Sequence, residues 1–192
     1  MRARWLLLMV LGCGEVGRMP ADAGFFTPGG RDAAPAAATD AGPNVAVQVG
    51  WVVDGDTVRL NAGSGAMAPD GKPLNQETVR LLGVDAPEIA HPNDPTNPTT
   101  MPECWGDEAH AAARNLMLGL QVRLEYGSST LRDDFGRLLA YLVLPDQRVA
   151  NELLISAGDA KSFRRYAHRD RDRYNQLEAE ARTRGGKVWG CP

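Results

Sequence analysis

At 192 residues and 43% hydrophobic content, the chain is long enough for one well-packed domain with appendages, which excludes a wholly disordered protein. Its formal net charge is −3, from 21 basic and 24 acidic residues. Nucleic-acid-binding proteins usually carry an excess of Lys and Arg that displaces counterions from phosphates, so composition alone argues against that class. Any assignment to nucleic-acid chemistry must therefore rest on local motifs.

Residues 1–12 have the pattern of an export signal. A positively charged start precedes the apolar run Trp5–Leu11, which is too short to span a bilayer. The sequence Val10-Leu11-Gly12-Cys13 resembles a bacterial lipobox, which predicts that Cys13 is lipidated and anchors the protein to a membrane. An ordinary signal peptide with an incidental cysteine is the alternative. Both interpretations predict a secreted or cell-envelope protein, with its folded domain in the periplasm or outside the cell.

Residues 13–44 are rich in Gly, Ala and Pro and have neither a helical nor a strand period. Such a segment cannot bury enough apolar surface to offset the entropy of ordering, so we expect a disordered linker. The folded domain is expected over residues 45–192. It contains Cys104 and Cys191, and an even pair of cysteines in an exported protein favours a disulfide. Zinc binding is the alternative, but neither cysteine belongs to a CxxC motif.

Two strands joined by a tight turn open the folded domain. Val45–Val53 is rich in valine, Thr57–Leu60 alternates polar and apolar residues, and the Asp54-Gly55 dipeptide between them is a hairpin signal. A long turn-rich segment follows, after which Thr78–Val84 is predicted to form a third strand. Three strands therefore precede the first helix.

The first helix is predicted over Trp105–Leu120, because its apolar residues recur at intervals of three and four. Two further strands are predicted at Val122–Tyr126 and Leu138–Leu144, followed by helices at Val149–Ala157 and Asp170–Arg184. Five short strands with a helix between the third and the fourth is the order of a five-stranded OB-fold barrel. We therefore predict an α+β fold, a β-barrel with about three α-helices.

Carboxylates and arginines gather near the ends of these strands. Asp56 lies at the hairpin, Arg80 lies on the third strand, Asp85 and Glu88 follow it, and Arg137 precedes the fifth strand. Cleavage of a phosphodiester requires an activated water and positive charge where negative charge accumulates in the transition state. Oxygen-rich sites suit hard cations such as calcium. Each motif alone is a common turn or loop, but together they indicate a metal-dependent phosphodiesterase.

Three motifs in this order resemble the signatures of the staphylococcal nuclease (thermonuclease) family. They are Val53–Val58, Val79–Glu88 and Asp133–Tyr141. The resemblance covers residues 45–190 and implies the SNase-like domain of that family. It also implies a calcium-dependent nuclease that hydrolyses DNA and RNA and leaves 3′-phosphate ends. We expect a monomer with no obligate protein partner.

The resemblance assigns roles to residues at matching positions. Asp56, Asp85 and the backbone carbonyl of Ala86 would bind calcium. Glu88 would be the general base that activates the attacking water, a role that typically contributes a factor of 10² to 10⁴ to the rate. A threonine is typical of the family at position 86, but its contribution is mainly a carbonyl, so we expect metal binding to survive with alanine.

Arg80 and Arg137 would bind the phosphate, because their planar guanidinium groups donate bidentately to phosphate oxygens. The loop before Arg137 departs from the family, with Asp134 in place of a lysine and Phe135 in place of a tyrosine. These changes remove one cation and one hydroxyl donor and weaken the expected grip on a terminal phosphate. The expected substrate-binding residues are Phe135, Lys161, Phe163, Arg165 and Tyr166.

A dense basic run over residues 161–173 is interleaved with aromatic residues. It is either the positive surface of the substrate groove or a solvated segment paired with neighbouring acidic residues. The three histidines, His91, His110 and His168, have no metal-ligand spacing, and we expect them at the surface or hydrogen-bonded elsewhere.

Two other functions compete with the nuclease. A nuclease-like barrel used only for binding would have lost catalytic side chains, whereas Arg80, Glu88 and Arg137 are all present. A sequence-tolerant single-strand binder needs stacking aromatic residues on its strands, and the aromatic content is only 6%. The sequence therefore favours the nuclease.

Overall fold

The computed structural model describes residues 46–61, 65–91 and 101–192. The expected signal segment and linker, including Cys13, lie outside the described residues. Within the described part of the chain, no helix combines the length and the apolar character needed to cross a bilayer.

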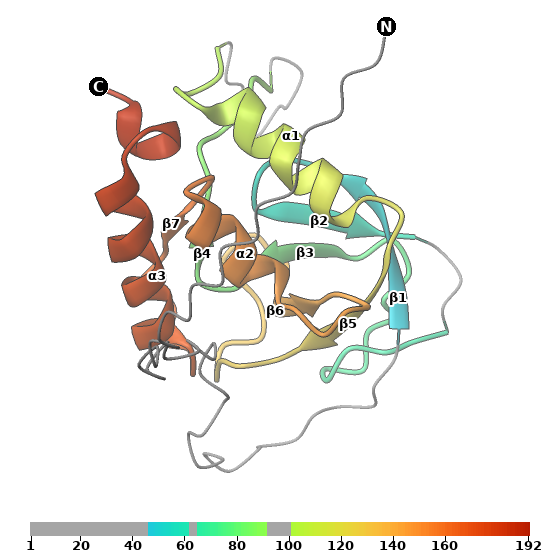
Figure 1. Ribbon diagram of the computed structural model, residues 1–192. Helices are drawn as coiled ribbons and strands as arrows, with labels where there is room; N and C mark the ends of the chain where they lie inside the picture. The colour runs from blue at the N-terminus through green and yellow to red at the C-terminus, as the bar shows by residue number, and fades with distance from the viewer. Residues whose placement is uncertain (1–45, 62–64, 92–100) are drawn as a thin grey trace, which may run out of the picture. The chain divides into compact units, whose positions relative to one another are not determined.

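Five strands close into a barrel in the order β1-β2-β3-β6-β5 (Figure 1). Neighbouring strands are antiparallel, except β3 and β6, which are parallel. Alternate residues of β5 are buried, the alternation in β1 is interrupted by a register shift after Val49, and every residue of β6 is buried. The predicted α+β barrel is thus confirmed. The barrel strands are β1 (Ala46–Val52), β2 (Thr57–Leu60), β3 (Thr78–Leu81), β5 (Gln121–Glu125) and β6 (Leu138–Val143).

The prediction of one continuous third strand, Thr78–Val84, was wrong. Strand β3 ends at Leu81, and Gly83 adopts a φ of 77°, a left-handed conformation that favours glycine. The chain then forms β4 (Val84–Asp85), which pairs with β7 (Lys161–Ser162) in a separate two-stranded sheet. The turn at Gly83 therefore takes the acidic motif out of the barrel sheet.

The buried side chain of Asn151 holds this turn in place. Its amide nitrogen donates to the carbonyl oxygens of Leu82, at 3.0 Å, and Ala140, at 3.3 Å. Its amide oxygen accepts from the backbone N–H of Leu142 at 3.0 Å. Asn151 is fully buried and its hydrogen bonds are all to backbone groups. It therefore fixes the first turn of its own helix against both β6 and the end of β3.

The described part of the chain has three α-helices, as predicted, although their ends differ from the prediction. The first helix ends three residues early, because Gly119 turns the chain with a φ of 78°. The last helix packs against α2 and β7 (Figure 1). A short 3-10 helix follows it. The helices are α1 (Gly106–Met117), α2 (Ala150–Ala157), α3 (Arg171–Arg184) and the 3-10 helix η1 (Lys187–Gly190).

A disulfide joins Cys104 to Cys191, whose Cα atoms are 5.8 Å apart and which are 87 residues apart in the chain. Cys104 lies two residues before α1, and Cys191 directly follows η1. The bond therefore connects the start of the first helix to the C-terminal segment.

Candidate active site

Asp56 is the most buried carboxylate of the candidate site, with 1% of its surface exposed. Its backbone N–H donates to Asp54 Oδ1 at 2.9 Å, which shapes the turn between β1 and β2. Its Oδ1 accepts from the hydroxyl of Thr57 at 3.1 Å, and its Oδ2 accepts from the backbone N–H of Ala86 at 2.8 Å. Asp56 thus connects the β1–β2 turn to the segment that follows β4.

Arg80, on β3, is also buried, with 8% of its surface exposed. Its Nη1 forms an ion pair with Asp56 Oδ1, and its Nη2 lies 3.4 Å from Asp85 Oδ1. The same Nη2 donates to the carbonyl oxygen of Val84 at 3.1 Å. Burial lowers the pKa of Arg80, but guanidinium groups remain protonated in proteins. Because the turn at Gly83 reverses the chain, one guanidinium group bridges two of the predicted metal ligands.

Glu88 is the partly exposed carboxylate of the site, with 39% of its side chain accessible. Burial raises the pKa of Glu88, and the negative charge of Asp54 raises it further, whereas Arg80 lowers it. A general base works best when its pKa lies near the pH of the reaction, so a raised pKa suits a carboxylate to this role near neutral pH. Partial exposure leaves the group accessible to water.

Asp54 and His91 complete a group that the sequence did not predict. Among the described residues, Asp54, Glu88 and His91 have ligand atoms that lie within 4.8 Å of one another, close enough to hold a metal ion. His91 Nε2 is 3.9 Å from a carboxylate oxygen of Glu88. Burial raises the pKa of Asp54, while the positive charge of Arg80 lowers it. The spacing of three residues between Glu88 and His91 was the available signal, but it is common in loops.

The candidate metal ligands therefore form two connected groups, of which only the first contains the residues expected from the sequence. Asp56 and Asp85 share the guanidinium group of Arg80, while Ala86 donates its N–H to Asp56. Asp54 lies between these ligands and Glu88, since it bonds to Asp56 and belongs to the group with Glu88. Carboxylate oxygens dominate both groups, and such donors suit a hard divalent cation.

Arg137 joins the site through the loop before β6. Its Nε donates to Asp133 Oδ2 at 2.6 Å, and its Nη1 lies 3.4 Å from the hydroxyl of Thr57, which also bonds to Asp56. The other oxygen of Asp133 accepts from the backbone N–H groups of Phe135 and Arg137. Asp133 therefore orients the arginine and closes its loop at the same time.

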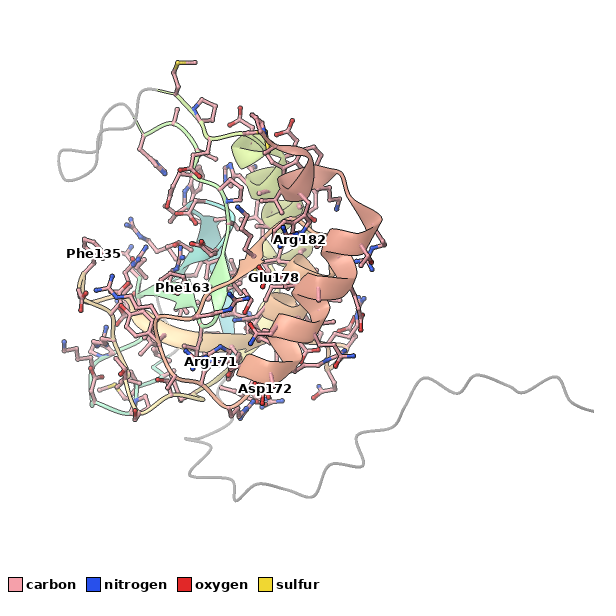
Figure 2. The ribbon with its side chains drawn as sticks, turned by 90° about the vertical axis from the view of Figure 1, so that its left-hand side faces the viewer. Phe135, Phe163, Arg171, Asp172, Glu178 and Arg182 are labelled. Atoms are coloured by element: carbon pink, nitrogen blue, oxygen red, sulfur yellow. A yellow bond between two sulfur atoms is a disulfide. The ribbon has the colours of Figure 1, made fainter. Side chains whose placement is uncertain are left out.

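The aromatic residues expected to bind substrate lie near Arg80 and Arg137, whereas Lys161 lies elsewhere. Phe135 is 82% exposed, lies against the guanidinium group of Arg137 and projects away from α3 in Figure 2. Phe163 packs against Tyr166 and lies 5.8 Å from the guanidinium carbon of Arg80. These aromatic rings border the two arginines. Lys161 instead lies over the ring of Trp189, 5.5 Å from its centre, outside this aromatic group.

The basic run is largely paired with acidic residues from other elements. Arg165 forms an ion pair with Asp134, and Arg164 forms one with Glu178 at 2.7 Å. Arg169 pairs with Glu125. This arrangement favours the interpretation of a locally neutralised segment for most of the run. Arg165 differs from the other arginines of the run because its partner, Asp134, belongs to the loop that carries Phe135.

A closed five-stranded barrel with arginines and carboxylates gathered at the β1–β2 turn defines a small OB-fold protein with a polar, oxygen-rich site. Residues 78–191 match the family described as "Staphylococcal nuclease homologue". The chain therefore belongs to the staphylococcal nuclease family, and the resemblance found in the three motifs is confirmed.

Several known proteins are similar to this chain. A thermonuclease of Staphylococcus hyicus is 32% identical over 139 residues, and one of Staphylococcus intermedius is 33% identical over 140 residues. Each alignment covers 72% of this chain and 72% of the relative. Endonuclease YncB of Bacillus subtilis is 29% identical over 147 residues, which are 76% of this chain and 62% of that protein.

Proposed function

We propose that this protein is a calcium-dependent nuclease that hydrolyses the phosphodiester bonds of DNA and RNA outside the cytoplasm. The names of its relatives, thermonuclease and endonuclease, support the reaction class. The single observation that carries the proposal is the convergence of Arg80, its two carboxylate partners and Glu88 around one turn of the barrel. This arrangement unites positive charge, candidate metal ligands and a base.

Calcium is the cation proposed for this site, because carboxylate and carbonyl oxygens are the ligands that it prefers. Asp56, Asp85 and the carbonyl oxygen of Ala86 would hold it, with Asp54 and Glu88 contributing nearby negative charge. The bound cation would supply positive charge to the phosphate and lower the pKa of water beside it. Arg80 orients Asp56 and Asp85 for this role, because it contacts both carboxylates.

Glu88 acts as the general base in this proposal and takes a proton from the water that attacks phosphorus. Arg80 and Arg137 donate hydrogen bonds to phosphate oxygens, where negative charge increases in the transition state. The bond to the 5′ oxygen breaks, which leaves a 3′-phosphate and a 5′-hydroxyl. The raised pKa of Glu88 favours proton transfer near neutral pH.

Substrate binding is proposed to depend on aromatic faces and cations at the border of the site. Phe135, Phe163 and Tyr166 offer rings for bases, each stacked base contributing about 1 to 3 kcal/mol. Arg165 and Lys161 add positive charge for the backbone. Stacking does not depend on base identity, so this arrangement fits an enzyme that accepts many sequences and both kinds of nucleic acid.

Export and a membrane anchor belong to the same proposal. Residues 1–12 would direct export, lipidated Cys13 would anchor the chain, and residues 13–44 would connect it to a monomeric nuclease domain at 45–192. The disulfide between Cys104 and Cys191 supports an oxidising compartment. Labelled palmitate should enter the wild-type protein but not Cys13→Ser, and equal labelling of both would remove the anchor from the proposal.

The decisive experiment is a nuclease assay of the purified protein on plasmid DNA, denatured DNA and RNA. We expect cleavage with calcium, none with a chelator, and a loss of roughly 10² to 10⁴ in rate for Glu88→Gln. Glu108→Gln, an exposed residue of α1, is the matched control and should cut normally. Undiminished cleavage by a Glu88→Gln, Arg80→Ala double variant would contradict the assignment of the site.

A further inference from the structure

The backbone of Glu88 is held by a single residue from a distant part of the loop. The backbone N–H of Glu103 donates to the carbonyl oxygen of Glu88 at 2.8 Å. In return, a carboxylate oxygen of Glu103 lies 3.3 Å from the backbone N–H of Glu88 and accepts its hydrogen bond. Glu103 thus binds both polar backbone groups of the residue proposed as general base.

Gly106 allows this close approach. A Cβ atom at Gly106 would lie 2.2 Å from the carbonyl oxygen of Glu88, closer than any side chain permits. The N–H of Gly106 donates to the carbonyl oxygen of Glu103 at 2.9 Å, so the two residues belong to one turn. The Glu103–Gly106 turn therefore fits directly against Glu88, without an intervening side chain.

This turn is attached to the C-terminal segment by a covalent bond and to Asp159, which follows α2, by a hydrogen bond. Cys104 forms the disulfide with Cys191, and the indole N–H of Trp105 donates to Asp159 Oδ1 at 3.1 Å. The other oxygen of Asp159 pairs with Lys187 at 2.9 Å, and Val188 is buried in the core. The C-terminal segment is thus a fixed anchor for the turn.

Glu88 lies outside the helices and strands of the described residues. Among the described residues between β4 and α1, none belongs to a helix or a strand, so no backbone ladder fixes Glu88. Segments with few backbone hydrogen bonds open at low free-energy cost. The hydrogen bonds to Glu103 and the disulfide beside it are therefore expected to determine where the Glu88 carboxylate points.

We propose that the Cys104–Cys191 disulfide acts through Glu103 as a positioning element for Glu88, so that turnover by the nuclease depends on the oxidation state of this cysteine pair. The inference rests on the proposed function, because it requires Glu88 to act as the base. Glu103, Cys104 and Cys191 would not touch the substrate.

Reduction by a dithiol would release the turn. One thiolate of the dithiol attacks a protein sulfur and forms a mixed disulfide, while the protein S–S bond breaks and the other cysteine leaves as a thiolate. The second thiol of the dithiol then displaces the remaining protein sulfur. The dithiol becomes a cyclic disulfide and transfers two electrons and two protons, which leave Cys104 and Cys191 as thiols. The reaction is balanced and needs no other reactant.

The first test compares the wild-type protein with a Cys104→Ser, Cys191→Ser double variant under calcium. We expect kcat to fall roughly 10- to 100-fold in the double variant, because a misplacement of about 1 Å has effects of this size, while KM stays within about twofold. Dithiothreitol should lower kcat of the wild type to the same level and leave the double variant unchanged. Thiol titration confirms the redox state, and circular dichroism confirms that each sample is folded at the assay temperature.

The second test leaves the disulfide intact. Glu103→Ala removes the acceptor for the Glu88 N–H and should lower kcat without changing KM, whereas Glu108→Gln on α1 should behave as wild type. Glu103→Gln retains an acceptor oxygen for the Glu88 N–H, so it should restore most of the kcat that Glu103→Ala loses. A general loss of stability would not give this rescue by the conservative variant.

The outcomes separate this inference from the proposed function. If the wild type does not cleave nucleic acid, or if Glu88→Gln cleaves normally, the proposed function fails. If the wild type cleaves and Glu88→Gln does not, but the folded double serine variant and Glu103→Ala keep wild-type kcat, only the positioning role fails. A rise in KM with unchanged kcat in these variants also overturns it.

Discussion

The two halves of the candidate site are built in opposite ways. Asp56 and Arg80 are buried, and their charged groups pair with each other and with neighbouring backbone groups. Around Phe135 and Arg165 the side chains are exposed, and their contacts join one loop to another. The comparison indicates that the geometry of the chemical groups is fixed by the barrel, whereas substrate recognition depends on surface residues that can change independently.

The largest effect is expected from Arg80, which tests the buried half. Arg80→Ala leaves the buried carboxylate of Asp56 without its partner, and breaking a buried ion pair in this way costs about 3 to 5 kcal/mol. The free energy of unfolding should fall by that amount in urea titrations, and kcat should fall by roughly 10² to 10³.

Two further variants sharpen this prediction. Arg80→Lys retains the charge but not the planar fork, so it should recover part of the stability and little of the activity. Arg59→Ala changes an exposed arginine of β2 and should alter neither quantity. If Arg80→Ala is as stable as the wild type, the buried ion pair between Arg80 and Asp56 is not required for stability.

A smaller effect is expected from Phe135, which tests the exposed half. Phe135→Ala removes a ring that is 82% exposed, so the free energy of unfolding should stay within about 0.5 kcal/mol of wild type. Loss of one stacking face should raise KM for single-stranded DNA by roughly 5- to 150-fold, with kcat unchanged. Steady-state kinetics on a short oligonucleotide measure both values. A fall in kcat at constant KM would instead place Phe135 in the chemical step.

The sequence predicted the barrel strands and the helices, but not the short second sheet, and both results have physical reasons. Alternation and helical spacing predicted five strands and three helices, because burial on one face produces these periods. The break at Gly83 and the pairing of β4 with β7 were missed, since a two-residue strand has no period to detect. The motifs placed Asp56, Arg80 and Asp85 in one site, and the structure brings them into contact.

The contacts of Glu88 with Glu103 and His91 were not predicted from the sequence. Glu103 binds the backbone N–H and carbonyl of Glu88, which every residue carries, so the amino-acid type at position 88 gives no signal for these contacts. His91 reaches Glu88 only because of the path of the loop. The roles assigned to Asp56, Asp85, Glu88 and Arg137 stay predictions until the variants are measured.

The smallest effect is expected from Asp134, whose exposed ion pair with Arg165 lies beside Phe135. Asp134→Asn removes a negative charge near the proposed path of the phosphate backbone and frees the guanidinium group of Arg165. Stability should change by less than about 1 kcal/mol, because exposed ion pairs contribute little. At low salt KM should fall roughly two- to fivefold, since long-range attraction of the substrate increases, and the difference should shrink as salt screens the charges.

Asp146→Asn is the matched control for this last prediction. Asp146 forms an exposed ion pair with Arg148 in the turn before α2, outside the candidate site. The Asp146→Asn substitution changes the net charge of the protein by the same amount as Asp134→Asn. An equal fall in KM in both variants would therefore assign the effect to net charge. A fall that is specific to Asp134→Asn, and is lost in the Asp134→Asn, Arg165→Ala double variant, would instead place Arg165 on the substrate. Unchanged KM in Asp134→Asn at low salt would remove this loop from the recognition half of the site.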